Sequence, residues 1–116
     1  MYGAYKKGDK VYRTKLTSCF NMFNGKTNLS SIVFKPGIDC SELTDMSCMF
    51  DGCETLTSLD LTSFDSSKVT NISNMFGFCK NLGSIKVSRN KWVISSSCNI
   101  TDMFYQCKVL SVTYVD

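Results

Sequence analysis

The sequence contains no histidine, and this absence removes most of the chemistry on which enzyme active sites rely. Imidazole is the usual general base beside serine and cysteine nucleophiles and a common zinc ligand. The seven cysteines include no C-x-x-C pair, which disfavours a zinc site. No phosphate-binding glycine loop, nucleophile elbow or dinucleotide fingerprint occurs. We therefore expect no enzyme, no catalytic residue, no metal site and no cofactor.

Long apolar runs are also missing, and proline occurs only once. No segment approaches the roughly 20 apolar residues that span a bilayer, so no membrane span is expected. With 43% hydrophobic and 20% charged residues, the composition is that of an ordinary globular domain. We expect one repeat domain over residues 1–116.

The formal net charge of +3 is concentrated at the N-terminus. Residues 1–15 contain a candidate basic patch, Lys6, Lys7, Lys10, Arg13 and Lys15. Such a patch can contact phosphate or an anionic surface, but a solvated, atypical end of the domain is the favoured interpretation. No nucleic-acid partner is expected. The opening residues also lack the apolar region of a signal peptide, and no lipidation box occurs.

Four copies of one sequence unit fill the remainder of the chain. Met-Phe recurs at Met22, Met49, Met75 and Met103, and a leucine follows each pair at a fixed distance, at Leu29, Leu56, Leu82 and Leu110. Three units place a cysteine three residues after the phenylalanine, at Cys53, Cys79 and Cys107, whereas the first unit has Lys26. The units predict coils at about 16–42, 43–68, 69–96 and 97–116.

Each unit contains a helical period followed by a strand period. Ile72, Met75, Phe76 and Cys79 fall at i, i+3, i+4 and i+7, which predicts a short helix. Asn71 and its counterparts Asp45 and Asn99 precede these segments as N-cap candidates. Alternating apolar residues then predict strands at 29–34, 56–61, 82–87 and 110–115.

One such unit cannot bury its own apolar face, so the coils must stack. The expected fold is α/β: a right-handed solenoid of about four coils that resembles a leucine-rich repeat, each coil with a short parallel strand and a short helix. Ladders of like residues would form the core, including Phe23, Phe50, Phe76 and Phe104.

The unit resembles a known repeat family. The segment Val-Thr-Asn-Ile-Ser-Asn-Met-Phe-x-x-Cys from Val69, the Leu-x-x-Leu-x-Leu pattern from Leu56 and Ser-Phe-Asp-Ser-Ser from Ser63 are similar to BspA-like leucine-rich repeats. These are repeats of roughly 25 residues, typical of mycoplasma lipoproteins and other bacterial surface proteins. The resemblance implies a surface or extracellular location and an adhesin-like role with host or matrix proteins as partners.

The cysteines divide into two groups. Cys19, Cys53, Cys79 and Cys107 occupy apolar repeat positions and are predicted to be core thiols. Cys40, Cys48 and Cys98 lie outside these positions, and their disulfide state stays open. We expect no dense disulfide framework.

The predicted strands offer one continuous outward face for binding another protein. If Leu59 and Leu61 point inward, the residues between them point out, and the same alternation applies in every coil. The candidate outward face is Ser31, Val33, Ser58, Asp60, Ser84, Lys86, Val112 and Tyr114. We expect a non-enzymatic protein-interaction module of a surface or secreted adhesin-like protein.

A second function follows from the ends of the stack. An end that lacks a capping segment exposes core side chains and unpaired backbone groups. The alternative is therefore a structural subunit of a larger assembly, which packs through its uncapped ends by self-association or against another protein.

Overall fold

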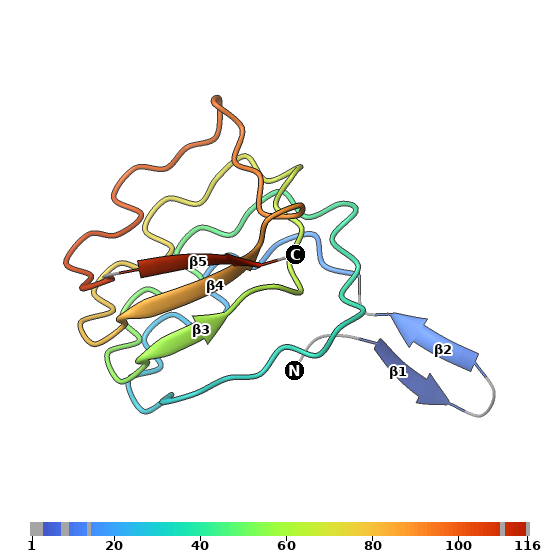
Figure 1. Cartoon of the computed structure of the whole chain (residues 1–116), viewed down its shortest axis with the longest axis horizontal. Coiled ribbons are helices and arrows are strands. Elements are labelled where there is room, and N and C mark those ends of the chain that lie inside the picture. The colour runs from blue at the N-terminus through green and yellow to red at the C-terminus, as the bar shows by residue number, and fades with distance from the viewer. Residues whose placement is uncertain (1–3, 8–9, 14, 110, 116) are drawn as a thin grey trace.

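The computed structural model of the chain describes residues 4–7, 10–13, 15–109 and 111–115. Strands β1 (Ala4–Lys7) and β2 (Lys10–Arg13) pair antiparallel as a hairpin. Strands β3 (Ser58–Asp60), β4 (Ser84–Ser88) and β5 (Ser111–Val115) form a separate parallel sheet in the order β3-β4-β5. Figure 1 shows the hairpin projecting from the side of a stack whose successive layers carry these three strands.

Three of the four predicted strands are present, and their pairing is parallel as expected. Leu59 lies opposite Ile85 and both are buried, whereas Ser58 and Asp60 on either side of Leu59 are exposed. No strand forms at residues 29–34. Hydroxyl groups of the next repeat bind carbonyls there instead: Thr55 Oγ1 donates to the Leu29 carbonyl at 2.8 Å, and Ser63 Oγ to that of Phe34 at 3.3 Å.

The predicted solenoid with a helix in every coil is wrong, because the residues that the structure describes contain no helix. The Met-Phe segments are runs of tight turns. In the third repeat, the N–H groups of Met75, Gly77 and Cys79 each donate to a carbonyl three residues earlier, at 3.1–3.2 Å. The N–H groups between them donate to carbonyls of the next repeat and not to carbonyls of their own, so the hydrogen-bond pattern of a helix cannot form.

Those intervening groups link neighbouring repeats through a ladder of backbone hydrogen bonds. Phe76 donates to the Met103 carbonyl at 2.9 Å, and Phe78 to that of Tyr105 at 2.8 Å. The first and second repeats follow the same rule, four N–H groups each donating to the next repeat. We call these four segments, residues 18–25, 45–52, 71–78 and 99–106, the turn ladder.

Left-handed backbone conformations shape every rung of the turn ladder. The residue before each Met has a φ of 54–57°, and the residue two after each Phe has a positive φ as well. The first position is Asn21, Cys48, Asn74 and Asp102, and the second is Gly25, Gly52, Phe78 and Gln106. Gly, Asn and Asp adopt this region most readily, which explains their use at five of the eight positions.

The predicted N-cap residues accept hydrogen bonds, but in turns. Asp45, Asn71 and Asn99 each accept the N–H of the residue two positions later, at 2.8–3.0 Å. Such bonds are the mark of an Asx-turn, the alternative that Asp and Asn offer to a helix start. The sequence therefore predicts that these side chains accept backbone N–H groups, but it does not predict that they do so in turns instead of at helix starts.

The core consists of the ladders that the repeat predicts. Rings of Phe23, Phe50, Phe76 and Phe104 stack in sequence, with centroids 5.4–5.9 Å apart and planes within 14° of parallel. Met49, Met75, Leu56 and Leu82 are fully buried beside them. Among the described residues, exposure rises toward both ends of the ladder, at Phe23 and at Phe104.

Candidate functional site

The middle of the predicted outward face is as expected. Asp60 and Lys86 are register neighbours on β3 and β4, and both side chains are exposed. The carboxylate of Asp60 accepts hydrogen bonds from the Thr62 hydroxyl at 2.6 Å and the Thr62 N–H at 3.0 Å. These bonds, together with the charge of Lys86, lower the pKa of Asp60. Ser58 and Ser84 complete a polar surface here.

The predicted position of Val112 and Tyr114 on the outward face beside Lys86 is wrong. Lys86 lies opposite Thr113, and Val112 and Tyr114 lie opposite the buried residues Ile85 and Val87. The loop before β5 is one residue shorter than that before β4, and a slip of one residue moves every side chain of a strand to the other face. Val112 and Tyr114 therefore sit on the core side of β5, yet remain exposed because they end the stack.

The remaining members of the outward face are Ser31 and Val33, near the opposite end of the stack. Val33 is 68% exposed, the largest exposure among the big apolar side chains of the described residues. With Phe23 and Ile32 it lines a cavity of about 350 Å³. The partner-binding role of the outward face stays a prediction.

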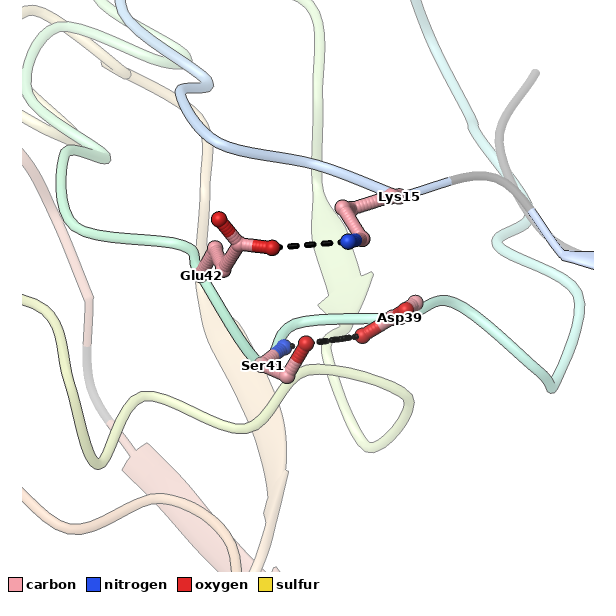
Figure 2. Close-up of polar contacts among 4 residues, drawn as sticks. All are labelled: Lys15, Asp39, Ser41 and Glu42. Atoms are coloured by element: carbon pink, nitrogen blue, oxygen red, sulfur yellow. Dashed lines mark hydrogen bonds and ion pairs between the residues drawn. The ribbon is translucent and has the colours of Figure 1, made fainter.

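The predicted basic patch is divided between the hairpin and the first repeat. Lys6 and Lys7 belong to β1, and Lys10 and Arg13 to β2, but their side chains lie outside the described part. Lys15 is drawn in Figure 2, where its Nζ lies 2.7 Å from Glu42 Oε2. This contact raises the pKa of Lys15 and links the beginning of the first repeat to its end. Because both side chains are exposed, the pair contributes little to stability.

A polar cleft of about 470 Å³ opens on the loop side of the stack. Its residues are Ile38, Asp39, Cys40, Ser41, Ser63, Asp65, Ser67, Lys68 and Lys91. Asp39 accepts the Ser41 hydroxyl at 2.6 Å (Figure 2), and bonds from Ser67 lower the pKa of Asp65. Burial raises the pKa of the Cys40 thiol, which keeps it protonated and weakly nucleophilic. The cleft therefore offers turn-forming carboxylates and no activated nucleophile.

All seven cysteines are free thiols. Cys19, Cys53 and Cys79 are fully buried, as predicted for core thiols, and Cys107 is half-buried. Cys53 and Cys79 each donate an S–H to the phenylalanine carbonyl of the preceding repeat at 3.1 Å. Cys40 and Cys98 are buried as well, while Cys48 is half-buried at a left-handed turn position.

The fourth repeat ends the turn ladder with donors that have no acceptor in the described part of the chain. These are the N–H groups of Ile100, Asp102, Phe104 and Gln106, at the positions that donate onward in the other three repeats. Ile100 and Phe104 are 56% and 42% exposed, and Val112 and Tyr114 extend the same surface on β5. We call this surface the donor end.

The first repeat ends the ladder with acceptors. Within the described residues, no donor reaches the carbonyls of Ser18, Phe20, Met22 and Asn24, which occupy the accepting positions of the later repeats. A cavity of about 470 Å³, lined by Phe23, Gly25, Lys26, Thr27, Asn28 and Leu29, lies beside them. We call this surface the acceptor end. Sequence reasoning anticipated exposed ends but not that they carry opposite hydrogen-bonding groups.

The repeats that carry both ends also identify the family. A family model described as "Mycoplasma protein of unknown function, DUF285" matches residues 7–115. The chain belongs to this family. The match covers β2, the parallel sheet and all four segments of the turn ladder.

No curated protein and no solved structure gives a significant match to this DUF285 chain. Among the described residues, no helix is long and apolar enough to cross a membrane. No cluster of three or more side chains suited to holding a metal ion occurs in that part of the chain either.

Proposed function

We propose that this DUF285 chain is a non-enzymatic protein-interaction module that acts as a building block of a larger assembly, with its ends as the contact surfaces. The main support for this proposal is the donor end, where four N–H groups without an acceptor in the described residues lie beside exposed apolar side chains. An edge of this kind favours pairing with another chain, because a partner that supplies acceptors satisfies the backbone while it covers the apolar groups.

The location that we propose for this assembly is the cell surface. DUF285 is described as a Mycoplasma family, and the repeat motif resembles BspA-like surface-protein repeats. We therefore propose an adhesin-like surface or secreted protein whose repeats support contact with host or matrix proteins. This assignment rests on resemblance and is separate from the geometry of the ends.

The outward face supports a second candidate function, direct adhesion to another protein. It is favoured by the exposed side chain of Val33 and by the exposed charges of Asp60 and Lys86. Its centre is otherwise serine and threonine, which offers few of the aromatic anchors that dominate binding energy. The ends therefore rank above it.

Site-specific photo-crosslinking in cells that express the full protein tests both functions. A photoreactive phenylalanine analogue replaces Phe104 at the donor end, Val33 on the outward face, or Val93 as a control. Val93 is exposed, and its backbone is held by Ser66. Protein adducts from position 104 above the level at 93 are expected. Adducts from 33 alone favour the second function, and none from either position overturns both.

A further inference from the structure

We infer that the donor end binds the acceptor end of a second copy of this chain, so that copies associate head to tail. The inference deepens the proposed assembly function and rests on it. The two ends are complementary in the hydrogen bonding of the turn ladder and in the spacing of the phenylalanine rings, because they carry the two sides of a turn-ladder junction.

The backbone groups match one for one. At each internal junction, four N–H groups of one repeat meet four carbonyls of the next, at 2.7–3.2 Å. The donor end presents the four N–H groups and the acceptor end the four carbonyls, with the same two-residue spacing along the chain. The register is therefore fixed: Ile100 donates to Ser18 of the second copy, and Phe104 to its Met22. Asp102 and Gln106 follow with its Phe20 and Asn24.

The apolar ladders continue across the same junction. Phe23 is stacked on Phe50 and faces the acceptor-end cavity, while Phe104 is stacked on Phe76 and is partly open to solvent. A second copy in the ladder register places its Phe23 over Phe104. Its half-buried Ile32, the counterpart of Leu59 and Ile85, then covers Val112.

The turn ladder favours this junction over a symmetric pair through the donor ends. Two donor ends brought together place N–H groups opposite N–H groups and leave every carbonyl of the acceptor ends unpaired. A head-to-tail junction uses two different surfaces, so each added copy leaves one free end of each kind. The association is therefore an open series of oligomers that grows with concentration.

Two variants that each block one end test the inference by sedimentation velocity. Phe104→Lys places a charge on the donor end. Leu29→Lys does the same in the acceptor-end cavity, where Leu29 is half-buried and a lysine stem can lie along the apolar surface. Val93→Lys is the matched control, an exposed apolar residue outside both ends. Circular dichroism and urea unfolding confirm that all variants are folded.

Wild type and Val93→Lys are expected to form a concentration-dependent series, and each end variant alone to weaken association by about tenfold or more. An equimolar mixture of the two end variants is expected to form a 1:1 dimer and nothing larger, because it retains one intact junction. Amide exchange by NMR is expected to slow at Ile100, Asp102, Phe104 and Gln106 on association.

A wild-type chain that stays monomeric at millimolar concentration overturns the inference, as does a mixture of end variants that behaves like its separate components. Oligomers that persist in Phe104→Lys also overturn it. If crosslinks from position 104 lead to a different protein while the purified chain is monomeric, the proposed function stands and only the second-copy partner is wrong.

Discussion

The ring of Phe76 lies 5.9 Å from that of Phe50, and their planes are 3° apart. Both residues are essentially inaccessible to solvent and occupy the same position in successive repeats. Identical side chains in identical backbone positions necessarily superpose when repeats stack, which accounts for the near-parallel planes. The stack is therefore held by a continuous aromatic column as well as by the turn ladder.

The first prediction concerns this column. Phe50→Ala and Phe76→Ala each open a cavity between two rings and are expected to cost about 3–5 kcal/mol of unfolding free energy. Phe104→Ala, at the exposed end of the same column, is the matched control and is expected to cost less than about 1.5 kcal/mol. Urea unfolding followed by tryptophan fluorescence measures both. Equal losses at all three positions would contradict the ladder.

The column also shows how far the sequence could predict the fold. The repeat period places Phe23, Phe50, Phe76 and Phe104 together without knowledge of secondary structure. The helix prediction was wrong because two successive tight turns return side chains inward at nearly the helical interval, as at Ile72, Met75 and Phe76. A hydrophobic period reports which residues face the core, and it does not report whether an N–H bonds within the repeat or to the next one.

The second prediction follows from the left-handed turn positions. Cys48 has a φ of 55°, where the equivalent residues of the first and third repeats are Asn21 and Asn74. Because asparagine tolerates this conformation better, Cys48→Asn is expected to stabilise the fold by about 0.5–1 kcal/mol. The reverse change, Asn74→Cys, is expected to destabilise it by a similar amount. Thermal and urea unfolding measure both, and a destabilised Cys48→Asn protein would refute the backbone argument.

The candidate site was predictable only where repeat spacing is regular. Asp60 and Lys86 both lie on the outward face as expected, because the first parallel pair keeps the 26-residue interval of the repeat. The prediction placed Val112 and Tyr114 on the wrong face because the segment from Cys107 to β5 is one residue shorter than the segment from Cys79 to β4. The spacing between the repeat leucines does not show this difference. The sequence could not predict the donor and acceptor ends, because they depend on which backbone N–H groups donate to carbonyls of the next repeat.

The third prediction concerns acid. Bonds from the Ser67 side chain and backbone lower the pKa of Asp65, so its carboxylate stabilises the fold above the unfolded pKa of about 4. That contribution is lost as the pH falls through the lower folded pKa. Asp65→Asn is expected to cost about 0.5 kcal/mol or less at pH 7, since the group is partly exposed and screened. The difference from wild type should vanish by pH 2.

Asp51 serves as the contrasting control for the acid experiment. Burial raises its pKa, so its ionisation opposes folding as the pH rises through the unfolded value of about 4. Asp51→Asn is expected to stabilise the protein slightly at pH 7, the opposite sign to Asp65→Asn. Urea unfolding at pH 2, 4 and 7 gives both signs, and the same sign for the two variants would contradict the assigned causes.

The fourth prediction concerns alkali and the buried thiols. Burial raises the pKa of Cys19 and of Cys79 to about 12, whereas an unfolded thiol ionises near pH 8.5. Between these values the unfolded chain releases thiol protons that the folded chain retains, so folding stability must fall as the pH rises. Each protonated thiol contributes up to about 1.4 kcal/mol per pH unit to that loss.

Urea unfolding from pH 7.5 to 10.5 measures the slope, and thiolate absorbance near 240 nm reports ionisation. Cys79→Ala is less stable at pH 7.5 because it leaves a cavity, yet its stability falls less steeply with pH than that of wild type. A Cys79→Ala slope equal to that of wild type would show that the thiol ionises in the folded protein.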